Sequence, residues 1–375
     1  MTCPYCEYAA KFHSYQQRRV LTVHGELKVR RAYYYCGRCK QSFLPYDEAL
    51  GLVDEISPGL MPLVCLAGTL LPFADAAEDV LKRFAGVQVS ASTVLRCTEG
   101  AGERLRAQQK EGRMVKPTQA EPKWTAPREA GQPAAYAGLD AFSVPMQGVQ
   151  ACQAEHRMLY TALLYTPQKE HTRYLVDFEL DALAAQVRSQ ARALGITQVS
   201  DLIAVTDGGN GLEEALQRHL AEDLTTILDW YHAAEHICAF AKVWHAHDEE
   251  ARTQWQQQAK SILYEQGGDA LLAHLRALEL PPRTSAEVQE ELRKLLGYFE
   301  NNRHRTDYPS YRHKGWDIGS GPTEAGCKII GERLKGSGMR WVEDGAATVA
   351  TLRALYVSGG NLWDGFWAQP HRAAA

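Results

Sequence analysis

The sequence lacks any long run of apolar residues. No apolar stretch approaches the roughly 20 residues that a transmembrane helix needs. The chain begins with Met-Thr-Cys-Pro-Tyr-Cys, which lacks the basic and then apolar pattern of a secretory signal. We therefore expect a protein that stays in the reducing cytoplasm and has no membrane partner.

An excess of positive charge is also missing. The formal net charge is −4 and the isoelectric point is about 6.4, so the whole-chain balance gives no sign of a nucleic-acid binder. Basic residues nevertheless concentrate in residues 1–40 and 303–340. The first stretch holds eight Lys or Arg against two Glu. Such basic runs are usually solvated surface, and contact with DNA is the alternative.

Disulfides are not expected among the nine cysteines of a cytoplasmic chain. Four of them form two CxxC pairs, Cys3 with Cys6 and Cys36 with Cys39, on either side of a predicted hairpin. Four thiolates supply the tetrahedral sulfur site that Zn²⁺ prefers and leave no open position for a catalytic water. We expect a structural zinc in a zinc ribbon over residues 1–45, and the other cysteines in the core.

The segments that follow the first CxxC pair have distinct patterns. Residues 19–35 alternate around Gly25-Glu26, which predicts a β-hairpin. Residues 46–108 are predicted to be helical, with a helix at 73–84 and a second that Ser90 or Ser92 caps. This pair resembles a helix-turn-helix, although any helical hairpin gives the same pattern. Residues 109–134 are rich in Pro, Gly and charge, as is typical of a linker.

Strands and helices alternate after residue 134. Strands are predicted at 134–142, 158–165, 201–207 and 224–229, and helices at 180–194 and 212–220. This alternation indicates an α/β sheet with parallel members. Residues 231–300 are helical and polar without a strand signal, which indicates an α-helical insertion, and Gly319 opens a last helical segment.

Two carboxylates fall at the ends of predicted strands, where α/β sheets gather ligands and metals. They are Asp140 and Asp207, and Glu324 lies at the start of a later helix. A single Asp after a strand is usually a turn former or a helix cap, whereas three such carboxylates together favour a site for Mg²⁺ or Mn²⁺. Two such ions about 3.5–4 Å apart serve phosphodiester chemistry, with Asp140 between them and the other two on the flanks. Asp229 also ends a strand and is the second candidate for the place of Asp207.

A competing motif is His232-Ala-Ala-Glu-His236, which matches the H-x-x-E-H signature of inverted zinc proteases. His232 and His236 would bind zinc and Glu235 would act as the general base. Because five-residue patterns recur by chance and no third ligand follows, we favour a helix packed on the sheet.

Several blocks of residues, in a fixed order, resemble the ISKra-type insertion-sequence transposases, which are relatives of the ISL-type and Mutator-like DDE enzymes. The blocks are Cys3-Pro-Tyr-Cys6, Tyr33-Tyr-Tyr-Cys-Gly-Arg-Cys39, Pro72-Phe-Ala-Asp-Ala-Ala-Glu78, Leu228-Asp-Trp-Tyr-His-Ala-Ala-Glu-His236, Gly319-Ser-Gly-Pro-Thr-Glu-Ala325, Gly338-Met-Arg-Trp341 and Leu352-Arg-Ala-Leu355. The resemblance covers almost the whole chain. It also makes the His-x-x-Glu-His run part of the transposase pattern.

The resemblance implies an α/β ribonuclease H-like catalytic core at 135–230 and 315–375, with the α-helical insertion at 231–314. The zinc ribbon and the helical domain precede it. Asp140, Asp207 and Glu324 then take the three catalytic positions of a DDE triad. The implied activity is metal-dependent strand cleavage and strand transfer at insertion-sequence ends. A catalytically inactive, transposase-derived DNA-binding protein is the alternative.

The partner implied is double-stranded DNA, both the transposon ends and the target, in the nucleoid. Because a transposase brings two DNA ends together, we expect a homodimer or a larger assembly. The side chains expected to contact DNA lie in the ribbon and after the triad glutamate: Arg30, Arg31, Lys328, Arg333, Lys335, Arg340 and Trp341.

Overall fold

The protein is seen in a computed structural model that describes residues 1–50, 52, 55–121, 124, 135–148, 154–169, 171–196, 202–209, 211–220 and 224–369. They divide into two compact units. The first comprises Met1–Arg106, Asp344–Arg353 and Gly365–Ala375, and the second comprises Ala107–Glu343 and Ala354–Asp364. With a three-stranded and a five-stranded sheet among many helices, the fold is mixed α/β. None of the helices in the described part of the chain has the length and apolar character to cross a bilayer.

The first unit begins with an antiparallel sheet of β1 (Lys11–Thr22), β2 (Gly25–Tyr35) and β3 (Ser42–Phe43). The predicted hairpin is confirmed, but its turn lies at Val23–His24 rather than Gly25-Glu26. The Thr22 hydroxyl explains the shift, because it accepts from the His24 amide (3.1 Å) and donates to the Gly25 carbonyl (2.9 Å). Gly25 (φ +112°) then opens β2 in a conformation that suits glycine.

Helices follow the sheet in the first unit: α1 (Pro45–Ala49), α2 (Met61–Leu70), α3 (Phe73–Asp75), the π-helical η1 (Ala76–Phe84) and α4 (Ala91–Lys110). The two predicted helices are confirmed. The Ser90 hydroxyl accepts from the Thr93 amide (3.1 Å), so Ser90 rather than Ser92 is the cap of α4. Helices α2 and α4 pack so closely that a Cβ on Gly68 would lie 2.3 Å from the Thr98 hydroxyl.

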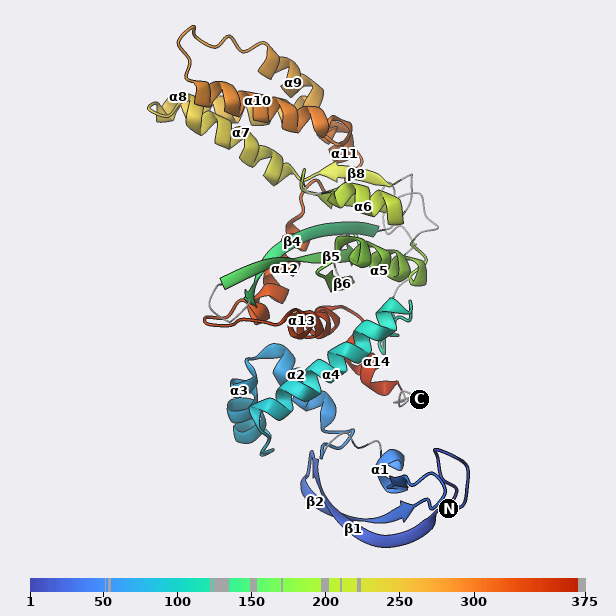
Figure 1. The fold of residues 1–375 in the computed structure, drawn as a ribbon. Helices are drawn as coiled ribbons and strands as arrows, with labels where there is room; N and C mark the ends of the chain where they lie inside the picture. Colours follow the sequence, from blue (N-terminus) through green and yellow to red (C-terminus); the bar gives the residue numbers. More distant parts are fainter. Residues whose placement is uncertain are drawn as a thin grey trace. The chain divides into compact units, whose positions relative to one another are not determined.

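The second unit is built on a five-stranded mixed sheet (Figure 1). Its strands are β4 (Ala135–Gln147), β5 (Ala154–Tyr165), β6 (Thr172–Asp177), β7 (Leu202–Thr206) and β8 (Thr225–Leu228), in the order β6-β5-β4-β7-β8. β4, β5 and β6 are antiparallel, whereas β7 and β8 run parallel to β4. Two differences from the sequence prediction are the unpredicted β6 and the longer β4, which pairs with β5 along its whole length.

The two faces of this sheet have separate cores. Alternate residues of β4 divide between them, as the pleat requires: Ala137 and Leu139 pack with α5 (Leu180–Ala193) and α6 (Leu212–His219), and Tyr136 packs on the other face. That second face meets α7 (Trp230–Trp244) through buried Ile237 and Phe240. We call it the α7 face.

A helical segment separates β8 from the last part of the unit (Figure 1, yellow to orange). Residues 230–313 are all described and contain no strand. After α7 come α8 (Glu249–Gln266), α9 (Gly268–Arg276), α10 (Ala286–Asn301), the 3₁₀ turn η4 (Arg303–Arg305) and α11 (Tyr308–His313). α12 (Gly321–Leu334) follows and packs on β4 and β5. The last helices are α13 (Glu343–Val357) and α14 (Leu362–Ala368), which contribute Asp344–Arg353 and the residues from Gly365 to the first unit. The helical character expected for 231–300 is confirmed.

Residues 109–134 were expected to form a linker. Residues 122, 123 and 125–134 of that stretch lie outside the described residues. In the described part, α4 continues to Lys110, and the Thr118 amide donates to the Gly360 carbonyl (3.2 Å). Trp124 is buried in the core beneath α5 and α6. The described residues from Ala107 onward are therefore part of the second unit.

Candidate functional site

Three aspartates stand next to one another where the parallel strands end: Asp140, Asp207 and Asp229. The residues just before them are paired across the strands, Leu139 with Thr206 and Thr206 with Leu228. Neighbouring strands lie about 4.8 Å apart, so the three carboxylates form a short row. β4 continues past Asp140 to Gln147, yet its parallel pairing with β7 stops at Leu139. Asp140 therefore lies at the carboxyl edge of the parallel strands despite its place within β4.

The three aspartates also point to the same face of the sheet. Side chains two residues apart along a strand share a face. The positions two or four residues earlier belong to the core of the α7 face: Tyr136, Val205 and Ile227. The row therefore faces the elements that bring Glu324 to the sheet.

Asp229 connects this row to the start of α12. It is fully buried (0% exposed) and caps α7, accepting from the His232 amide (2.7 Å). The same carboxylate oxygen lies 3.1 Å from Nδ1 of His232, and the other oxygen accepts from the Ser320 amide. The Ser320 hydroxyl in turn donates to Glu324 (2.8 Å). Asp229 therefore orients Glu324 through Ser320.

The charges in this site are coupled. Burial opposes ionisation of Asp229, but its hydrogen bonds from His232 and Ser320 lower the pKa of that carboxyl. The same bond to Asp229 raises the pKa of His232 to about 9, so the imidazole is a cation at neutral pH. Burial raises the pKa of Asp207, and the nearby Asp140 carboxylate raises it further. Neighbouring carboxylates that repel each other favour a bound cation.

One group in this region has its ligand atoms within metal-binding reach. Asp229, His232 and Glu324 each offer one atom, and these atoms lie within 4.8 Å of one another. Within the described residues, Asp140, Asp207 and Glu324 do not form a group that tight. The structure thus places Asp140 and Asp207 on neighbouring strands, and it groups Glu324 with Asp229 and His232. Sequence reasoning ranked Asp229 second and missed its pairing with His232, although a strand-end Asp three residues before a His was a readable signal.

A glycine permits the approach of α12. A Cβ on Gly138 would lie 1.8 Å from the Thr323 hydroxyl oxygen, so the helix start rests directly on β4. Because Gly138 precedes Asp140 by two residues and Thr323 precedes Glu324 by one, this contact sets the separation of the two carboxylates.

We expect Gly138→Ala to destabilise the protein by about 1–3 kcal/mol, the usual cost of overpacking. Urea unfolding of the purified protein measures this change. The control is Gly297→Ala in α10, where an added Cβ meets nothing within 4 Å and where alanine should stabilise by roughly 0.5–1 kcal/mol. Equal unfolding free energies for the two variants would contradict the close contact.

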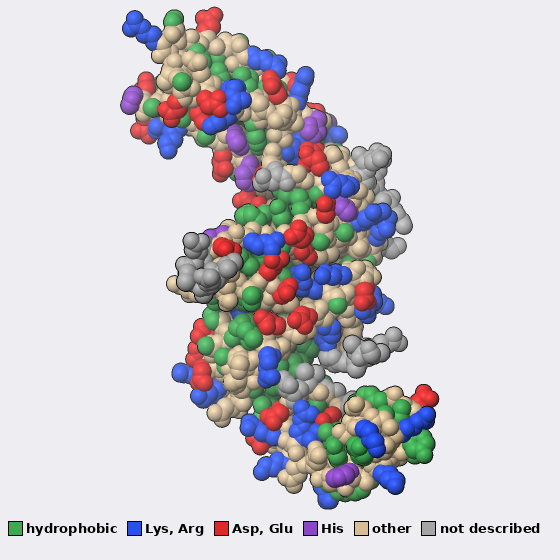
Figure 2. Space-filling model, in the orientation of Figure 1, with side chains coloured by type: hydrophobic (Ala, Val, Ile, Leu, Met, Phe, Trp, Pro, Cys, Tyr) green, Lys and Arg blue, Asp and Glu red, His purple; other side chains and the backbone are tan. Residues whose placement is uncertain are grey.

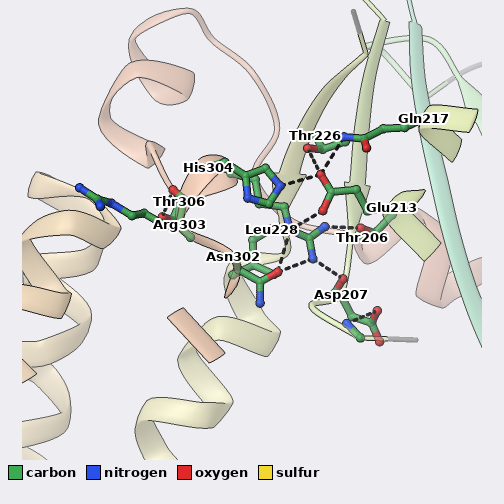
Figure 3. A network of polar contacts seen from close by, with 12 residues as sticks. Thr206, Asp207, Glu213, Gln217, Thr226, Leu228, Asn302, Arg303, His304 and Thr306 are labelled. Carbon is green, nitrogen blue, oxygen red and sulfur yellow. Dashed lines mark hydrogen bonds and ion pairs between the residues drawn. The ribbon is translucent and has the colours of Figure 1, made fainter. Parts of the chain in front are cut away.

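A buried arginine, Arg305, holds the turn at Asp207. Figure 3 shows the network of polar contacts to which Thr206, Asp207, Glu213 and Asn302 belong. Arg305 is 2% exposed and donates to the Thr206 hydroxyl (2.8 Å) and to the Asp207 carbonyl (2.9 Å). It also forms an ion pair with Glu213 (3.4 Å) and donates to Asn302. The helical segment is therefore hydrogen bonded to the strand end that carries Asp207.

The His-x-x-Glu-His run lies on α7, and its two histidines have different partners. His232 is bound to Asp229, whereas His236 stacks on Tyr298 with ring centres 3.8 Å apart. Among the described residues, the group of potential ligands that contains His232 does not include His236. This arrangement favours the interpretation of the run as a helix packed in the fold.

The four cysteines of the CxxC pairs form a second candidate metal site. Their sulfur atoms lie within 4.8 Å of one another, with 3.6 Å between Cys3 and Cys39 and 3.6 Å between Cys6 and Cys36. A tetrahedral zinc with Zn–S bonds of about 2.3 Å requires sulfur separations of about 3.8 Å. The four sulfurs therefore fit a metal such as zinc.

The two knuckles that carry these cysteines have the same backbone geometry. The Glu7 amide donates to the Cys3 carbonyl (3.0 Å), and the Lys40 amide donates to the Cys36 carbonyl (2.9 Å). Glu7 and Lys40 both adopt positive φ (58° and 62°). Backbone N–H groups of Cys39 and Arg38 lower the pKa of Cys36 to about 6, which favours the thiolate that binds metals.

The residues expected to contact DNA divide into exposed and buried ones. Arg30 is exposed and lies over the Tyr15 ring (4.0 Å). Exposed side chains after the triad glutamate are Lys328, Lys335 and Arg340. The buried ones are Arg31, paired with Asp47, and Arg333 and Trp341, which pack on each other. Figure 2 shows Lys and Arg interspersed with Asp and Glu on the face drawn.

In comparisons with known proteins, the chain matches no family model and no curated protein sequence.

Proposed function

We propose that the chain is a DDE-type transposase that cleaves and transfers DNA strands with Mg²⁺ or Mn²⁺. The observation that carries the proposal is the row of aspartates at the carboxyl edge of β4, β7 and β8, with Glu324 brought to it by α12. The mixed sheet supports a ribonuclease H-like core. The helical segment between β8 and α12 supports the insertion expected before the last glutamate.

Each residue of the site has a part in this proposal. The divalent ions would be held by Asp140, Asp207 and Glu324, because carboxylate oxygens are good ligands for hard cations. When bound, the ions supply an activated water or 3′-hydroxyl and stabilise the leaving oxygen. Arg305 fixes the Asp207 turn, and Asp229 acts through Ser320 to orient Glu324.

DNA contact is assigned to the cysteine module, taken as a zinc ribbon, and to the helices that follow it. The exposed Arg30 belongs to this module, and the exposed cations that follow Glu324 in the chain would hold phosphates: Lys328, Lys335 and Arg340. Because transposition joins two DNA ends, the proposed active form is a homodimer or a larger assembly.

Strand cleavage and joining on labelled DNA from the flanks of the coding sequence tests the proposal. We expect products with Mg²⁺ or Mn²⁺ for the wild type, and a loss of more than about 100-fold for Asp140→Asn, since even groups behind the metal ligands are worth 10–100-fold. The control is Asp181→Asn on α5, an exposed carboxylate on the opposite face. A wild type that binds this DNA without ever cutting it would instead establish a DNA-binding protein without catalysis.

A further inference from the structure

A pocket of about 420 Å³ lies next to the carboxylate site. Its volume falls within the roughly 300–1,000 Å³ of sites that take small organic groups. Three aromatic rings line it, from Trp230 and Tyr231 at the start of α7 and from Tyr264 on α8. Another wall is formed by residues before and at the start of α12: Asp317, Ile318, Gly319, Gly321 and Pro322.

Two of the rings are fixed by their neighbours and the third is exposed. Trp230 meets Tyr264 edge to face with ring centres 5.1 Å apart, and it meets Tyr308 at 5.3 Å. The Arg312 guanidinium lies 3.6 Å from the centre of the Tyr264 ring. Tyr231 is 62% exposed, and its ring lies so close to Gly319 that a Cβ there would be 2.8 Å away. The pocket therefore offers a fixed aromatic wall and an exposed ring.

The pocket and the carboxylate site share one stretch of backbone. Gly319 and Gly321 line the pocket, and Ser320 between them bonds to both Asp229 and Glu324. The Trp230 amide also donates to the Ile318 carbonyl (2.9 Å), which ties the aromatic wall to this stretch. A ligand in the pocket is thus next to the groups that hold the proposed catalytic glutamate.

We propose that this pocket binds one unpaired nucleobase of the DNA end, stacked on Tyr231 and the adjoining aromatic wall, so that a neighbouring phosphate reaches the carboxylates. The inference rests on the proposed function and specifies how the strand is held. Aromatic rings bind bases by stacking whatever the sequence. A base must leave the duplex to enter such a pocket.

The charges of the pocket suit a base better than a phosphate. Among the described residues that line the pocket, the cationic side chain is Lys169, which forms an ion pair with Asp317 (3.2 Å). An anionic group would meet the Asp317 carboxylate as well as the lysine. A nucleobase is uncharged, and its exocyclic amines can donate to a carboxylate.

Fluorescence of 2-aminopurine tests the proposal without cleavage. A single-stranded oligonucleotide of the end sequence, with 2-aminopurine placed in turn near its terminus, is titrated with protein in the absence of Mg²⁺ and Mn²⁺. We expect quenching at one position with the wild type and with Tyr231→Phe. Tyr231→Ala should lose that quenching and bind roughly 5- to 100-fold more weakly, as expected for one lost stacking partner. The control is Tyr356→Ala on α13, another exposed aromatic (40%), which should behave as the wild type.

The cleavage assay separates failure of the pocket from failure of the proposed function. With an abasic nucleotide at the quenched position, the wild type should fall to the cleavage rate of Tyr231→Ala. If Tyr231→Ala keeps the quenching and the affinity of the wild type, the pocket proposal is wrong. Metal-dependent cleavage by the wild type would in that case still support the proposed function. If the quenching depends on Tyr231 but the wild type never cuts DNA, the pocket proposal is supported and the proposed transposase activity is wrong.

Discussion

Cys36→Ser is expected to remove bound zinc and to unfold the module formed by β1, β2 and β3. The module buries little apolar surface around the cysteines, where the buried cluster consists of four residues: Cys3, Ala10, Cys36 and Phe43. Domains of about 40 residues usually need a metal, disulfides or a partner to fold. Structural zinc supplies roughly 10–16 kcal/mol of apparent binding free energy. Removing one of four thiolates therefore removes the main source of stability.

Metal analysis and limited proteolysis measure this result. We expect one equivalent of zinc in the wild type and none in Cys36→Ser, together with rapid cleavage within residues 1–43. The matched control is Cys238→Ser, a half-buried cysteine outside the cluster, which should keep the zinc and the protease resistance. A Cys36→Ser protein that keeps both would refute the metal site, as would a wild type that is folded and metal-free.

Local sequence signals predicted the features that local structure determines. Two CxxC pairs around an alternating stretch indicated the cysteine cluster and the hairpin, and apolar runs indicated β4, β5, β7 and β8. β6 was missed, although Thr172–Asp177 pairs with β5, the preceding strand in the chain, as an edge strand of the sheet. The hairpin turn was misplaced because the Thr22 hydroxyl closes it two residues early.

The candidate site depends on contacts between distant residues, which a single sequence does not reveal. Strand ends identified Asp140 and Asp207, but only the register shows that Asp229 continues the same row. The link from Asp229 to Ser320 spans 91 positions and that from Arg305 to Asp207 spans 98. Burial was equally hidden: Arg31 and Arg333 look like surface cations in the sequence, yet both are buried against internal partners.

Asp229→Ala is expected to weaken both the fold and the proposed cleavage. The change removes the cap of α7, worth about 1 kcal/mol, and a buried charged acceptor of the Ser320 amide, worth roughly 1.5–3 kcal/mol. Because Ser320 also holds Glu324, metal-dependent cleavage should fall by about 10- to 100-fold. Asp229→Asn should restore the cap and part of the stability, without restoring the cleavage rate.

Urea unfolding and the strand-cleavage assay measure the two effects separately. The control is Asp248→Ala, which removes the exposed cap of α8 (2.9 Å to the Ala251 amide) and should cost about 1 kcal/mol with no loss of cleavage. If Asp229→Ala cut DNA as fast as Asp248→Ala, Asp229 would be a helix cap and nothing more.

The pH dependence of stability gives an independent test of the Asp229–His232 pair. Its bond to Asp229 raises the pKa of His232 to about 9 in the folded protein, above the ordinary value of about 6.5 in the unfolded chain. As long as Asp229 is ionised, the pair therefore contributes its full stability below pH 6.5 and loses it as the pH rises toward 9. In buffer without Mg²⁺ or Mn²⁺, the unfolding free energy of the wild type should decline across this window, and that of Asp229→Asn should decline less. Parallel curves would show that His232 is not held by the Asp229 charge, and the orientation of Glu324 would then rest on Ser320 alone.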